Sequence, residues 1–137
     1  MRALIVYSGQ SRRIQAIVEA ISSVIQSKGD EVKEVKAERG SGATTSLFIY
    51  DLVYVGSPVL GFWGGKFPEP LASYIKNSSG LEGKKTVVFV TPRVIGVTRT
   101  LKRIMKLLEE KGSIVIAFRT IKNLPQAKDF GKILYKI

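Results

Sequence analysis

Short, uninterrupted apolar runs alternate along this chain with stretches whose apolar residues recur every three or four positions. The runs 2–7, 51–56 and 86–91 are rich in β-branched and aromatic residues, a composition typical of strands that are buried on both faces. Between them, the apolar positions of 14–25 follow the i, i+3, i+4, i+7 spacing of an amphipathic helix, which Gly29 would end. This alternation predicts parallel strands joined by helical crossovers.

The rest of the chain continues the same pattern. Strands are predicted over 31–36 and 113–121, and helices after Pro68, over 98–111 and from Pro125 onward. With 137 residues, the chain is long enough for one domain with a real core, so we expect a single domain over 1–137. The predicted class is α/β, with a five-stranded parallel sheet and helices on both of its faces.

Function in such a sheet is expected beyond the carboxyl ends of the strands, here in the loops 8–13, 57–66 and 91–99. Four glycines stand in or next to the second loop and would let the backbone approach a ligand closely: Gly56, Gly61, Gly64 and Gly65. Phe62 and Trp63 offer flat apolar faces beside that backbone, which suits a planar ring system. The alternative is a surface turn whose aromatic residues cap the core.

Composition excludes several kinds of chemistry. The chain has no cysteine and no histidine, which excludes disulfides, thiolate chemistry and His-based triads and argues against a metal centre. No side chain is therefore nominated as a catalytic acid, base or metal ligand. No apolar run reaches the roughly 20 residues of a membrane helix, and no signal peptide is recognised, so a cytoplasmic location without a membrane partner is expected.

The turn after the first strand, Ser8-Gly-Gln-Ser-Arg-Arg13, separates the common functions of this architecture. It has a single glycine, which excludes the G-x-G-x-x-G of a dinucleotide-binding unit, and it lacks a P-loop lysine. Receiver domains need acidic residues at the ends of the first and third strands, where this chain has Ser8 and Ser57.

The segments Leu4–Ser8, Val18–Ile21, Asp51–Pro58, Glu82–Thr91 and Leu107–Gly112 resemble, in order and spacing, those of the short-chain flavodoxin family. The resemblance covers essentially the whole chain. It implies a three-layer, doubly wound sheet with strand order 2-1-3-4-5, and FMN as the cofactor. The phosphate would lie at the first loop, with the ring between the second and third. The implied FMN-binding residues are Ser8, Gly9, Gln10, Ser11, Arg12, Arg13, Ser57, Pro58, Gly61, Phe62, Trp63, Gly64, Thr91, Pro92 and Arg93.

The first loop departs from the family pattern, because its Thr-Gly pair and final threonine are missing. Arg12 and Arg13 stand there instead. Their guanidinium groups would bind phosphate by direct charge, or they mark a phosphate site that has been lost.

Positive charge is concentrated in the second part of the chain. The formal net charge is +11, and residues 84–137 hold 13 Lys and Arg against 3 Asp and Glu. Helical spacing puts four of these cations on one face, where they would dock an acidic redox partner or form a solvated surface: Arg99, Lys102, Arg103 and Lys106. Nucleic acid is disfavoured, because no aromatic residue is interleaved with these charges. The sequence leaves open whether two copies of the chain form a homodimer that covers Phe62 and Trp63.

Together these features predict an FMN-binding protein that acts in electron transfer or as a small flavin-dependent reductase. In either role the flavin would carry the redox chemistry, so whether the chain is a carrier or an enzyme stays open. The alternative is a binding module that has lost flavin and docks an acidic partner through its basic helix face.

Overall fold

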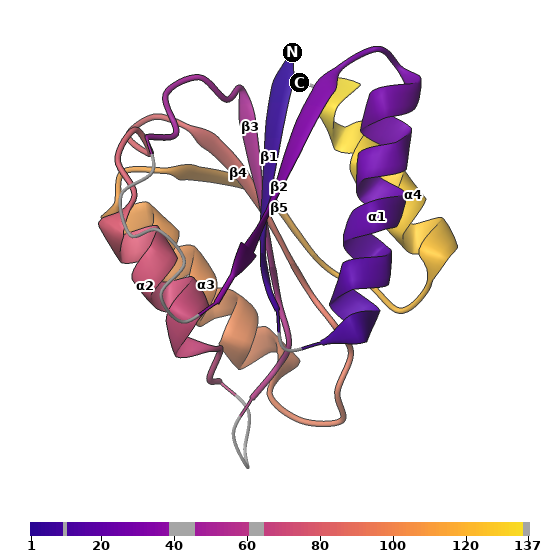
Figure 1. Cartoon of the computed structure of the whole chain (residues 1–137). Helices are drawn as coiled ribbons and strands as arrows, with labels where there is room; N and C mark the ends of the chain where they lie inside the picture. Colours follow the sequence, from indigo (N-terminus) through magenta and orange to yellow (C-terminus); the bar gives the residue numbers. More distant parts are fainter. Residues whose placement is uncertain (10, 39–45, 61–64, 136–137) are drawn as a thin grey trace.

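The computed structural model describes residues 1–9, 11–38, 46–60 and 65–135, which form a five-stranded sheet between two layers of helices (Figure 1). The strands are β1 (Arg2–Ser8), β2 (Glu31–Ala37), β3 (Leu52–Ser57), β4 (Lys85–Val90) and β5 (Ile114–Thr120). The helices are α1 (Arg12–Ser27), α2 (Glu69–Asn77), α3 (Val97–Glu110) and α4 (Leu124–Gly131), followed by the 3-10 helix η1 (Lys132–Tyr135). The predicted strands and helices are thereby confirmed, except that the last α-helix ends at Gly131 and is followed by the 3-10 helix.

The strand order is β2-β1-β3-β4-β5, and all neighbouring strands are parallel. The predicted fold class and strand order are confirmed. After β1 the chain crosses to β2 on one side, and β3 then returns to the other side of β1. The winding therefore reverses between β1 and β3, where open α/β sheets bind their ligands.

Two apolar cores hold the layers together, one on each face of the sheet. The alternating side chains of β1 supply both, because Ile5 packs with α1 and α4 whereas Leu4 packs with α2 and α3. Figure 1 shows the same division, with α1 and α4 on one side of the sheet and α2 and α3 on the other. Since both faces of the inner strands are buried, apolar residues follow one another without alternation in the sequence.

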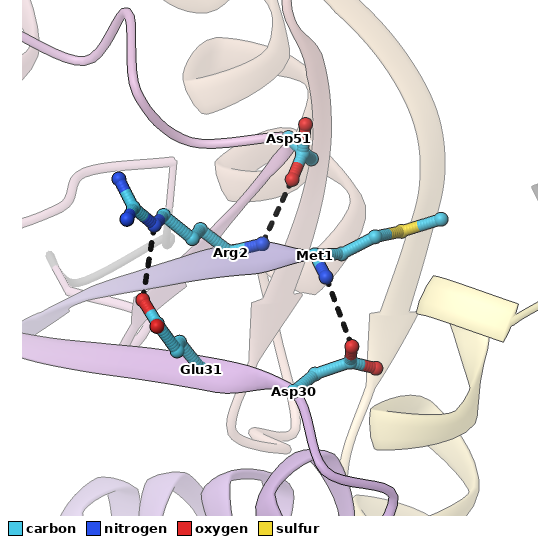
Figure 2. A network of polar contacts seen from close by, with 5 residues as sticks. All are labelled: Met1, Arg2, Asp30, Glu31 and Asp51. Atoms are coloured by element: carbon cyan, nitrogen blue, oxygen red, sulfur yellow. Dashed lines mark hydrogen bonds and ion pairs between the residues drawn. The ribbon is translucent and has the colours of Figure 1, made fainter.

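Polar contacts join the amino ends of three strands (Figure 2). The Met1 amine donates to Asp30 Oδ1 at 3.0 Å, and the Arg2 backbone N–H donates to Asp51 Oδ2 at 2.8 Å. The Arg2 side chain also pairs with Glu31, with 3.0 Å between Nε and Oε2. Both ion pairs are partly exposed and each contributes little to stability. Their consequence is positional, because they hold three carboxylates at the edge of the sheet opposite the predicted loops.

Gly56 has a packing role beneath the carboxyl edge of the sheet. The Phe89 ring of the neighbouring strand occupies the space that a Cβ at this position would fill. The expectation that Gly56 lets a ligand approach is therefore wrong, because an internal side chain already uses the space. Phe89 is fully buried and its ring meets Phe130 edge to face, with 5.8 Å between the ring centroids.

The substitution Gly56→Ala should destabilise the protein, because the new methyl group forces the buried Phe89 ring out of its position. We expect a loss of about 1–3 kcal/mol in the free energy of unfolding, measured by urea denaturation. Adding Phe89→Leu should recover part of this loss, so the two changes together should cost less than their sum. Strictly additive effects would contradict the packing role of Gly56.

Candidate functional site

Three hydroxyl residues end the three inner strands at the carboxyl edge: Ser8, Ser57 and Thr91 follow or close β1, β3 and β4. The register aligns Tyr7 with Gly56 and Ser57 with Val90, so Ser8 and Ser57 end neighbouring strands at the same level and Thr91 lies one position beyond them. All three are buried. The Ser57 hydroxyl donates to the Pro58 carbonyl oxygen at 2.8 Å, and the Thr91 N–H donates to the Ser57 carbonyl at 3.3 Å. These three residues lie at the base of the predicted loops.

The first loop leads into α1 through a capped helix start. Ser11 has an extended backbone, and its Oγ accepts a hydrogen bond from the Ile14 N–H at 3.4 Å. The first turn of α1 carries no acidic residue and opens with Arg12 and Arg13, whose side chains are exposed. The unpaired N–H groups of a helix start and two adjacent guanidinium groups both favour an anion here. Gly9 is half-buried beside them, and Gln10 lies outside the described residues.

Arg13 has a structural contact as well. Its Nη2 donates to the Lys122 carbonyl at 3.1 Å and so joins the start of α1 to the loop between β5 and α4. That loop is fixed in turn by the Lys122 N–H, which donates to Gln126 Oε1 at 2.7 Å. Arg12 has no such tie within the described part of the chain. Of the two arginines, Arg12 is therefore the freer to meet an anion.

The second and third loops are joined by Arg93. Its Nη1 donates to the Val59 carbonyl at 3.0 Å, across the gap between the two loops. Val59 is buried, whereas Pro58 and Pro92 on either side of this contact are half-buried. The bond holds together the two loops between which the sequence resemblance puts the flavin ring.

The predicted ring-contacting residues Gly61, Phe62, Trp63 and Gly64 lie outside the described residues. Their flanks are joined by a pair of backbone hydrogen bonds between Leu60 and Lys66, at 2.8 and 3.2 Å.

Gly65, at the end of the second loop, contacts the start of α3. Its N–H donates to Thr100 Oγ1 at 3.0 Å, and the Arg99 side chain lies where a Cβ on Gly65 would be. The space beside Gly65 is thus occupied by the Arg99 side chain, and ligand approach at this glycine stays a prediction. The sequence analysis missed Thr100, although its spacing of four from Ile104 puts it in the apolar stripe of α3 and its burial follows from that.

A cavity of about 550 Å³ opens on the β2 side of the same edge. It is lined by Gly9, Leu60, Glu38, Lys66 and Glu69, among others. Its volume is in the range of small-molecule sites. Because two carboxylates face it against one lysine, it suits a phosphate group less than the start of α1 does.

Tyr7 directly precedes Ser8 in β1 and is buried in the core on the α1 side. Burial raises the pKa of its phenol, and the nearby carboxylates Glu34, Glu19 and Glu38 raise it further. All of these causes disfavour the phenolate in the folded state.

Within the described residues, no group of acidic side chains could hold a metal ion, and no helix is long and apolar enough to cross a bilayer.

The chain matches no protein-family model and no curated protein by sequence. Its fold, by contrast, is shared with solved structures. Flavodoxin 1 from Bacillus cereus superimposes with a TM-score of 0.78 at 18% identity, over 99% of this chain and 98% of that one. A flavodoxin from the domain Archaea gives 0.75 at 21%, over 99% and 97%. The flavodiiron protein from Giardia intestinalis gives 0.76 at 14%, with 98% of this chain matching 35% of that one.

These likenesses define the class of the protein at the level of its fold. The chain has a flavodoxin-like fold, as the sequence resemblance predicted.

The raised pKa of Tyr7 predicts a loss of stability in alkali. The stability that the protonated Tyr7 phenol contributes is fully present below its unfolded-state pKa of about 10. It is lost as the pH rises from there through the higher pKa of the folded state. We therefore expect the unfolding free energy of the wild type to fall more steeply above pH 10 than that of Tyr7→Phe, by at most about 1.4 kcal/mol per pH unit. Urea denaturation of both proteins at several pH values measures this difference, and parallel curves would contradict it.

Proposed function

We propose that the carboxyl edge of the sheet binds FMN and that the protein carries electrons through the bound flavin, between partners or to a small-molecule acceptor. The observation that carries this proposal is the convergence of the loops after β1, β3 and β4 at the point where the winding reverses, on a fold shared with flavodoxins.

The residues at the start of α1 fit the phosphate of FMN. The Ser11 hydroxyl, the N–H groups of the first helical turn and the Arg12 guanidinium offer donors of three kinds, and no carboxylate stands in that turn. Charge thus replaces the missing threonines of the family's phosphate loop. In this proposal Arg13 keeps its contact with Lys122 and orients the helix start rather than the phosphate.

The ring of the flavin would lie between the second and third loops. When bound, FMN supplies the electron-accepting ring, and the chain supplies anchoring, orientation and exclusion of water. Arg93 would have to release the Val59 carbonyl or shift along it to admit the ring. Its guanidinium would then supply positive charge near the bound cofactor.

A second candidate function is a binding module without flavin. The Arg93–Val59 hydrogen bond favours it, because that contact already joins the two loops that the ring would separate. The altered first loop is consistent with this function as well.

The substitution Ser11→Asp separates the two functions. Aspartate is as good an N-cap as serine, so α1 should form as before, but its carboxylate repels a phosphate at the same place. We expect the wild type to quench the fluorescence of added FMN. Ser11→Asp should bind FMN at least about tenfold more weakly, a loss of ~1.4 kcal/mol.

Riboflavin provides the control, because it has the same ring without the phosphate. Its affinity should change by less than about threefold in Ser11→Asp. Equal losses of affinity for FMN and riboflavin would contradict a phosphate site at the start of α1. If the wild type quenches the fluorescence of neither ligand, the protein is the binding module without flavin.

A further inference from the structure

One segment of the chain carries cations and no acidic residue. Residues 83–108 contain Lys84, Lys85, Arg93, Arg99, Lys102, Arg103 and Lys106, but no Asp or Glu. The segment includes β4, the third loop and most of α3, so five of these seven cations lie between the carboxyl edge of the sheet and the outer face of one helix.

The basic residues of α3 are exposed. Arg99, Lys102, Arg103 and Lys106 follow the i, i+3, i+4, i+7 spacing of one helix face. Within the described part of the chain, none of the four forms an ion pair with a carboxylate. The first turn of α3 has no acidic residue, so the first of these cations stand near the positive end of the helix dipole. That position disfavours the isolated helix and favours contact with an external anionic surface.

The beginning of this face is fixed against the candidate flavin site. Arg99 packs along Gly65, and the Thr100 hydroxyl accepts the Gly65 N–H at 3.0 Å. The basic face of α3 is therefore continuous with the end of the second loop.

The third loop adds an apolar tip to the same surface. The side chain of Val94 is 99% exposed and that of Ile95 is 47% exposed, and they stand between Arg93 and the start of α3. Nothing within the chain is gained by holding a β-branched residue fully in water. An exposed apolar residue next to basic residues is a composition found in protein interfaces, which combine an apolar centre with a polar rim.

We propose that Arg93–Ile95, together with Arg99, Lys102, Arg103 and Lys106, forms a docking surface for an acidic protein. The carboxylates of the partner would meet the unpaired cations, and an apolar side chain of the partner would cover Val94. Long-range attraction would speed the encounter. Only the use of the contact, electron exchange beside the flavin, rests on the proposed function; association itself does not.

Other anionic macromolecules fit this surface less well. Nucleic acid would leave Val94 and Ile95 in water, because its phosphates meet only the cations. Membrane-binding surfaces are anchored by Trp, Phe or Leu, none of which stands at this tip.

Two acidic peptides test the charge and the apolar tip separately. We would use labelled peptides of about 20 residues, one of glutamate alone and one in which every fourth glutamate is replaced by leucine, and follow fluorescence anisotropy without flavin. Both should bind at low salt and weaken as salt screens the charges. The leucine-containing peptide should bind more tightly. Val94→Ser with Ile95→Ser should abolish that difference while changing polyglutamate binding by less than about twofold.

Reversing the charge of three α3 residues tests whether the acidic peptides bind at this surface. Arg99→Glu, Lys102→Glu and Arg103→Glu together should weaken both peptides by at least about tenfold, and acidic residues near the start of α3 should not harm the helix. The matched control is Lys28→Glu, Lys33→Glu and Lys128→Glu, at exposed positions outside this surface. It lowers the net charge equally, from +11, and should change binding by less than about threefold.

Equal losses in the two triple variants would overturn the proposal, because binding would then follow net charge alone. A single-stranded oligothymidylate or vesicles containing phosphatidylserine that bind more tightly than the leucine-containing peptide at the same salt would also overturn it. Because these measurements omit flavin, they are independent of whether FMN binds at the site.

Discussion

Burial of the inner strands on both faces is the constraint on which the rest of this structure depends. β1, β3 and β4 present apolar side chains to two cores at once, and the connections β1–β2, β3–β4 and β4–β5 each carry a helix over one face or the other. Parallel pairing then brings all the strand ends to one edge. The loops that share this edge are far apart in the sequence, and no local interaction would bring them together. A site at this edge is therefore a consequence of how the core is made.

Charge is distributed unevenly over this framework, and the unevenness bears on function. Carboxylates at the amino edge are held by Met1 and Arg2, whereas the start of α1 and the outer face of α3 present cations without carboxylate partners in the described structure. A phosphorylated cofactor and an acidic protein would both use positive charge near the same edge. Arg93 belongs to the docking surface proposed above and also contacts the second loop, because it donates to the Val59 carbonyl and precedes the exposed Val94.

The glycines near the site illustrate what the sequence predicts about the site and what it does not. Glycine in a loop after a strand is a sound signal for close approach of backbone, but the sequence does not say what approaches. At Gly56 it is the Phe89 ring, and at Gly65 it is the Arg99 side chain, and both come from elements distant in the sequence. Thr100 was missed for a similar reason, since its partner, the Gly65 N–H, is 35 residues away. The predicted residues at Gln10 and 61–64 lie outside the described structure, so their roles stay predictions.

The sequence by itself determined the class, the elements and their order, because apolar periodicity reports which side of each element is buried. It also located the basic face of α3 and the three loops that meet at one edge. Only the tertiary structure decided which groups in those loops are already used within the protein. The Arg93–Val59 and Arg13–Lys122 hydrogen bonds and the exposure of Val94 depend on distances between segments that the sheet brings together. A linear pattern records neighbours along one element, whereas a binding site is made of neighbours across several.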